Sequence, residues 1–156
     1  MEDSRKSIVA RAEKVFSAVE RPQHFTDHMH CCECQDHDDE LQPFTPATVT
    51  REALGHMGWD PITFCTNHGF RYFLPGMIRI VMTETGDDNY YEQFLWHLNW
   101  DGDENDRIKV CTPREREIVH QSLLWLLENR VEEIEEDMVS NELLMAIERW
   151  GNQEEA

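Results

Sequence analysis

The chain has 156 residues, of which 40% are hydrophobic, so it is long enough for one domain with a packed core, and disorder throughout is excluded. Its formal net charge of −18 disfavours direct binding of nucleic acid or of an anionic membrane and favours a basic protein partner, although solvation alone also explains an acidic surface. It lacks both the apolar core of a signal peptide and the roughly 20 apolar residues of a membrane span, so we expect a cytoplasmic protein with free thiols.

The N-terminal segment has the pattern of an amphipathic helix, capped by Ser4 or Ser7 and ended by Pro22. Its apolar residues recur three and four positions apart: Ile8, Ala12, Val15, Phe16 and Val19. Periodicity then disappears from 23 to 48, which predicts a long loop. Loops of this length are uncommon in a compact domain, and a bound metal would organise this one.

The middle of the chain is predicted to be mainly helical. Apolar spacing and capping residues predict helices over 51–54, 66–81 and 89–98. Alternation over 62–64 resembles a very short strand. Pro75, in the middle of the second of these helices, should kink or break it.

The clearest local signal is Thr112-Pro113-Arg114-Glu115, in which Thr112 is a good N-cap and Glu115 completes a capping box. The helix that follows is apolar on one broad face and strongly acidic on the other, and it either runs on or restarts at Ser140. We therefore predict a mostly α, single-domain fold over 1–156, with a core at 1–131 and an acidic helical C-terminal extension at 132–156.

The most chemically specific feature is the run from His28 to His37, which holds three histidines and three of the five cysteines. Thiolate and imidazole are preferred zinc ligands, and Cys31-x-x-Cys34 has the spacing of a zinc half-knuckle. With one imidazole before and one after, the predicted Cys2His2 ligand set is His30, Cys31, Cys34 and His37. Four residues remain open as replacements: His28, Cys32, His56 and His68.

Two other interpretations of this run remain open. One is a polar surface loop whose cysteines are partly buried. The other is thiol redox chemistry, which ranks lower because a reactive thiolate needs positive neighbours or a helix N-terminus. The nearby acids should instead raise the thiol pKa values, and a divalent cation would offset the negative charge of these acids. They are Glu33, Asp36, Asp38 and Asp39.

Three stretches together resemble an uncharacterised bacterial family of small acidic proteins, a domain of unknown function. They are the His-Cys-x-x-Cys of His30, Cys31 and Cys34, then Gly-Trp-Asp-Pro at 58–61, then Phe-Arg-Tyr-Phe-Leu-Pro at 70–75. The resemblance covers roughly residues 8 to 130 and implies no mechanism, because that family has no established activity. The last of these motifs also resembles a segment of small bacterial proteins of the toxin-immunity kind.

These observations predict a protein-interaction module with a structural zinc ion, of the immunity or inhibitor type, that binds a basic partner. No residue is assigned a catalytic role. The first alternative is a zinc-dependent hydrolase, which would need an open coordination position and a general base such as Glu33. The second is a thiol sensor that releases zinc on oxidation.

Overall fold

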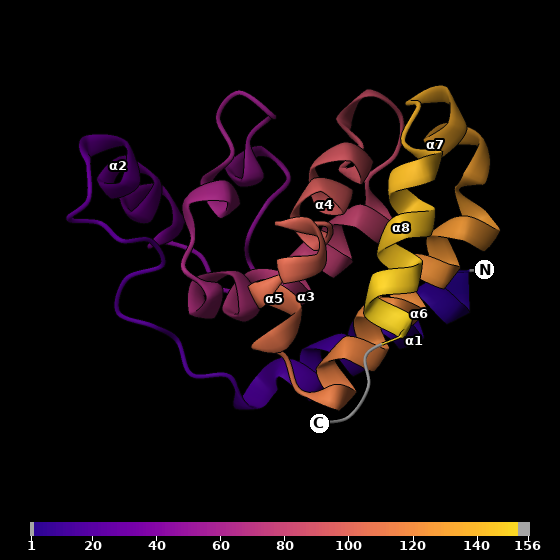
Figure 1. The fold of residues 1–156 in the computed structure, drawn as a ribbon, viewed down its shortest axis with the longest axis horizontal. Coiled ribbons are helices and arrows are strands. Elements are labelled where there is room, and N and C mark those ends of the chain that lie inside the picture. The colour runs from indigo at the N-terminus through magenta and orange to yellow at the C-terminus, as the bar shows by residue number, and fades with distance from the viewer. Residues whose placement is uncertain (1, 153–156) are drawn as a thin grey trace.

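The fold is built almost entirely from helices, which confirms the prediction of a mostly α domain (Figure 1). The computed structural model describes residues 2–152, and within that range it contains two isolated β-bridges and no β-strand. The helices are α1 (Glu2–Val15), α2 (Cys32–Leu41), α3 (Asn67–Thr83), α4 (Tyr91–Leu98), α5 (Asp106–Lys109), α6 (Pro113–Asn129), α7 (Val131–Glu136) and α8 (Ser140–Gly151). Over 2–152, none of them is long and apolar enough to cross a membrane.

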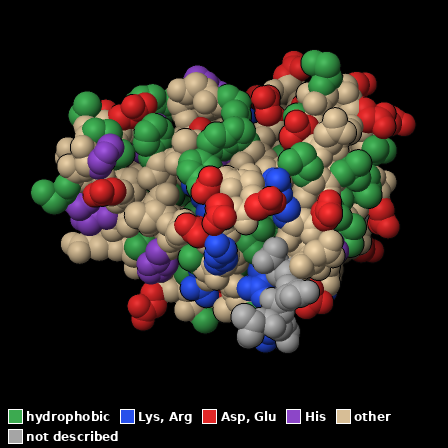
Figure 2. All heavy atoms as spheres, viewed as in Figure 1, with side chains coloured by type: hydrophobic (Ala, Val, Ile, Leu, Met, Phe, Trp, Pro, Cys, Tyr) green, Lys and Arg blue, Asp and Glu red, His purple; other side chains and the backbone are tan. Residues whose placement is uncertain are grey.

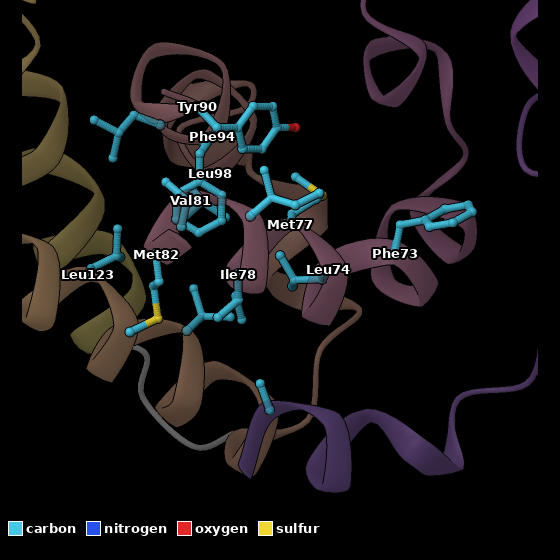
Figure 3. Close-up of a cluster of buried hydrophobic side chains, with 14 of the residues drawn as sticks. Phe73, Leu74, Met77, Ile78, Val81, Met82, Tyr90, Phe94, Leu98 and Leu123 are labelled. Carbon is cyan, nitrogen blue, oxygen red and sulfur yellow. The ribbon is translucent and has the colours of Figure 1, made fainter. Parts of the chain in front are cut away.

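Helix α3 forms the centre of the core, and α1, α4, α5 and α6 pack around it (Figures 1 and 3). Its buried side chains meet Tyr90 and Phe94 from the start of α4 and Leu123 from α6. The helix is continuous through Pro75. The residue after Pro75 must be glycine, because the backbone of Pro46 passes close to it. A Cβ atom on Gly76 would lie 2.6 Å from the Pro46 carbonyl oxygen.

Helix α6 begins as its sequence predicts. The Thr112 hydroxyl accepts a hydrogen bond from the Glu115 N–H, and the Glu115 carboxylate accepts one from the Thr112 N–H, which is the predicted capping box. The segment predicted as an acidic extension, 132–156, forms two separate helices, α7 and α8, within its described residues. Its apolar side packs on α6 and α4 and is buried in the common core through Leu143, Ala146 and Trp150.

The prediction of an unstructured loop over 23–48 was wrong in its centre, which forms α2. The buried residues of α2 have helical spacing, but they are Cys34, His37, Asp38 and Leu41, so hydrophobicity alone does not reveal them. The segment 62–64 is likewise part of a 3₁₀ turn, Pro61–Phe64, because the Asp60 carboxylate caps the Ile62 N–H.

The surface reflects the composition (Figure 2). In this view acidic side chains spread over most of the face, with several at the α7 end, while Lys and Arg appear only from near the centre to the lower edge. The histidines lie mainly toward the α2 end of the molecule. The two ends of the domain therefore differ in chemistry: one is acidic, and the other carries most of the groups that can bind a metal.

Candidate metal centre

Three of the four predicted ligands converge at the start of α2. Ligand atoms of His30, Cys31 and Cys34 all lie within 4.8 Å of one another. The two sulfurs are 3.2 Å apart, and the Cys34 sulfur is 3.7 Å from His30 Nδ1. Ligand atoms of a tetrahedral zinc ion lie roughly 3.5–3.8 Å apart. The spacing therefore fits two thiolates and one imidazole on a single ion, and the two sulfurs are also close enough to form a disulfide on oxidation.

Local backbone geometry places these three groups together. The His30 N–H donates to the Asp27 carbonyl, which closes a turn and brings the imidazole back toward the helix. Cys31 is the N-cap of α2, and its sulfur accepts a hydrogen bond from the Cys34 N–H at 3.3 Å. His30 and Cys31 are exposed and Cys34 is buried, so the group has one side in the protein and one in solvent.

The helix start also separates the pKa values of the two thiols. Hydrogen bonds from the Cys34 backbone and thiol, and then from His30, lower the pKa of Cys31 to about 7. The hydrogen bond to Cys31, followed by burial, raises the pKa of Cys34 to about 11. The expectation that acids would raise both thiol pKa values is therefore wrong for Cys31, because the N-terminus of α2 supplies donors to its thiolate.

His37 lies outside this group, unlike in the predicted ligand set. Its ring is fully buried and packs against Trp59 and Phe64, with ring centroids 4.2 and 4.4 Å away. Its Nδ1 is 3.3 Å from a Glu40 carboxylate oxygen, and Glu40 also accepts a hydrogen bond from the Trp59 indole. The helical turn after Cys34 thus directs His37 into an aromatic contact instead of toward the thiols.

The residues held open as replacements are also outside the group of three over residues 2–152. The rings of His28 and His24 stack at 3.5 Å. His56 Nδ1 accepts from the Gly58 N–H within its own turn, and His68 Nε2 is 2.8 Å from the Glu20 carbonyl oxygen. The described chain therefore brings three ligands together and leaves a fourth position for another donor.

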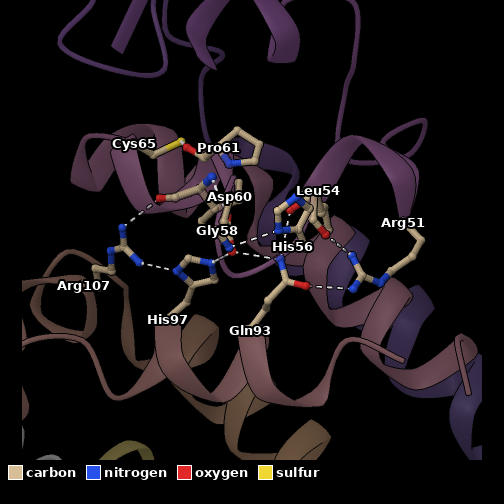
Figure 4. Close-up of polar contacts among 12 residues, drawn as sticks. Arg51, Leu54, His56, Gly58, Asp60, Pro61, Cys65, Gln93, His97 and Arg107 are labelled. Atoms are coloured by element: carbon tan, nitrogen blue, oxygen red, sulfur yellow. Dashed lines mark hydrogen bonds and ion pairs between the residues drawn. The ribbon is translucent and has the colours of Figure 1, made fainter. Parts of the chain in front are cut away.

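A second polar cluster, which the sequence did not reveal, lies inside the fold (Figure 4). Asp60 Oδ2 is 2.8 Å from His97 Nε2 and accepts a hydrogen bond from the Gln93 amide at 3.0 Å. Arg107 donates to His97 Nδ1 at 3.1 Å and to the Ile62 carbonyl oxygen at 2.9 Å. Because Arg107 has only N–H donors, His97 accepts through Nδ1 and donates to Asp60 through Nε2.

Burial governs the protonation states of this cluster. It lowers the pKa of His97, although the hydrogen bond to Asp60 opposes the shift, so the imidazole is neutral. Burial also favours the neutral form of Asp60, but hydrogen bonds from His97, Gln93 and Ile62 outweigh it and leave the Asp60 pKa below its usual value. At most 3% of Asp60, His97 or Arg107 is exposed, so a substrate cannot reach the cluster and its role is structural.

Comparison of the chain with known protein families, curated proteins and solved structures finds no match.

Proposed function

We propose that the protein is a zinc-stabilised interaction module that binds a basic protein partner. The convergence of two sulfurs and one imidazole nitrogen within 4.8 Å at the start of α2 supports the metal site. A zinc ion there would connect the turn at Asp27 and His30 to the first turn of α2. The segment before α2, residues 19–31, contains no helix, so a metal crosslink there would add to the stability of this end of the domain.

The acidic surface supports the partner. The net charge of −18 favours association with a basic protein, as an immunity-type protein would bind a basic toxin. On α7, Glu132, Glu135 and Glu136 are exposed and make no ion pair among residues 2–152. Glu133 differs, because its carboxylate accepts hydrogen bonds from the Gly86 N–H and the Tyr91 hydroxyl and so holds the fold together.

Elemental analysis of the purified, reduced protein tests the metal site. We expect about one zinc per chain after dialysis without chelator, and loss of the ion in Cys31→Ser and Cys34→Ser. Cys32→Ser is the matched control, because Cys32 is exposed and outside the group. Substitution with cobalt adds a second readout, since sulfur-to-cobalt charge-transfer absorption reports thiolate coordination directly. Reduced protein that binds no transition metal would contradict the site.

Capture from a lysate of the source cells tests the partner. We expect wild type to retain a basic protein that salt releases, and a variant with Glu132, Glu135 and Glu136 changed to Gln to retain less at low salt. The control removes the same charge from exposed positions on α1 and just after it, with the changes Asp3→Asn, Glu13→Gln and Glu20→Gln. Equal loss in both variants would contradict binding through α7, and a wild type that retains no basic protein would contradict the partner.

The fourth coordination position favours a second candidate, a zinc-dependent hydrolase. Catalytic zinc sites use three protein ligands and leave one position for water, and the described chain supplies three. Glu33 is exposed and adjacent in sequence, so it is the candidate general base. Zinc-dependent ester hydrolysis that Glu33→Gln abolishes, with the zinc content unchanged, would support this candidate over the binding module.

A further inference from the structure

We propose that a pocket between the end of α4 and the start of α8 binds the guanidinium group of an arginine side chain from the basic partner. The inference rests on the proposed function and names the chemistry by which such a partner would be recognised. Helices α4 and α8 pack side by side (Figure 1). The pocket is lined by residues from the end of α4, the turn after it and the start of α8. Its volume is about 530 Å³, and its lining is Trp96, Asn99, Trp100, Asp101 and Glu142.

Two indole rings give the pocket its walls. Trp96 lies in the last turn of α4, and Trp100 lies in the turn that follows its C-cap, Asn99. Their ring centroids are 4.9 Å apart and the rings meet at 76°, so they form a corner. Trp96 is 44% exposed, although most side chains of α4 are buried. The corner thus presents aromatic surface to solvent.

Two carboxylates add negative charge to this corner. Asp101 follows Trp100 in a left-handed turn, with φ of 57°, and Glu142 lies in the first turn of α8. Both are exposed, and neither carboxylate makes a hydrogen bond or ion pair with the residues that the structure describes. The remaining lining residue is already engaged, because Asn99 donates to the Glu142 carbonyl oxygen and accepts from Arg149.

This combination selects an organic cation. Aromatic faces attract cations, and the two carboxylates would neutralise the charge of a bound cation. An apolar ligand would make no ion pair with Asp101 or Glu142. A guanidinium fits better than an ammonium, because it is planar, stacks on indole and binds a carboxylate through two N–H groups. The protein already uses the same stacking internally, with the Arg107 guanidinium 4.0 Å from the Trp100 ring centroid.

Small probes test the pocket without any partner. Nα-acetyl-arginine methylamide is titrated against the purified full-length protein while the indole N–H resonances are followed by NMR, after assignment with Trp→Phe variants. We expect saturable shifts of the Trp96 and Trp100 signals in the millimolar range, since a single side chain makes few contacts. The lysine methylamide should bind at least about threefold more weakly. The neutral citrulline methylamide, which has nearly the same shape, should not bind.

Variants separate the carboxylates from the aromatic wall. Glu142→Gln should weaken arginine methylamide binding about threefold, and Trp96→Leu about tenfold, consistent with a cation–π contact. Glu148→Gln is the matched control, because Glu148 is an exposed acid on the same helix and outside the pocket lining. It should leave binding unchanged. If Trp96→Leu fails to fold, Glu142→Gln at an exposed site still decides the outcome.

Three outcomes would overturn the inference: equal binding of the citrulline methylamide, equal binding of the lysine methylamide, or equal weakening by Glu142→Gln and Glu148→Gln. Failure of the proposed function is a different result. In that case the arginine methylamide would bind with the expected variant pattern, while no basic protein would be retained from the lysate.

Discussion

The buried cluster around His97 and the exposed group around His30 each place a histidine beside ionisable side chains. They differ in whether the histidine nitrogens are free to bind a ligand. In the buried cluster both nitrogens of His97 are engaged, one by Asp60 and the other by Arg107, so none is left for a ligand. At the start of α2, His30 and two sulfurs converge at an exposed edge. Burial and lone-pair availability, more than residue type, therefore separate a structural histidine from a candidate ligand.

The largest expected effect tests whether the buried cluster is structural. Asp60→Leu removes the only carboxylate bonded to His97 among the described residues and leaves the Arg107 charge buried. Asp60 and Arg107 carry the opposite charges of the cluster and are linked through the neutral His97, so removal of Asp60 leaves a buried charge without its counter-charge. Such a loss costs about 3–5 kcal/mol, and we expect it in urea-induced unfolding. Asp106→Asn is the control, because its ion pair with Lys109 is exposed, and it should cost under about 0.5 kcal/mol. Similar costs for the two would show that the cluster contributes no special stability.

A smaller effect concerns pH and sharpens the comparison. The pKa of His97 is lowered in the fold, so the unfolded chain binds a proton first as the pH falls below about 6.5, and stability decreases from there downward. The Asp60 pKa is also lowered, so its contribution is present above about pH 4 and is lost at lower pH. Each proton contributes at most about 1.4 kcal/mol per pH unit.

The measurement is urea unfolding between pH 7.5 and 4.5, in the presence of a chelator so that the metal site does not contribute. We expect His97→Gln to be less stable throughout but to show a flatter dependence below pH 6.5 than wild type. His120→Gln, at a partly exposed position on α6, serves as the control. An unchanged slope in His97→Gln would assign the pH dependence to other groups.

The two clusters also show what a sequence can predict. The capping box of α6 is confirmed, and it was predictable because it depends on four consecutive residues. The convergence of His30, Cys31 and Cys34 was predictable for the same reason, since the three lie within five positions. The position of His37 was not predictable, because the rings of Trp59 and Phe64 that pack against it come from a distant segment of the sequence. The buried cluster joins three separate segments, and no local pattern brings them together.

A third prediction compares the two helix starts. Thr112→Ala should cost about 1 kcal/mol, because it removes the oxygen that caps the Glu115 N–H. Cys31→Ser should cost less in zinc-free protein, since serine is itself a good N-cap and can accept the same bond from Cys34. Unfolding in denaturant with chelator measures both. A larger loss for Cys31→Ser without metal would give its sulfur a role in the fold beyond capping and metal binding.

The smallest expected effect is the most useful for choosing between a binding module and an enzyme. Cys32 is the first residue of α2, exposed, and outside the group of three, so Cys32→Ser should change stability by less than about 0.5 kcal/mol and leave the zinc content unchanged. If this variant lost zinc as fully as Cys34→Ser, Cys32 would be the fourth ligand. The site would then be closed, and closed sites are structural. Retained zinc in Cys32→Ser, together with exchangeable water on a cobalt-substituted site, would instead leave a coordination position open, which hydrolysis requires.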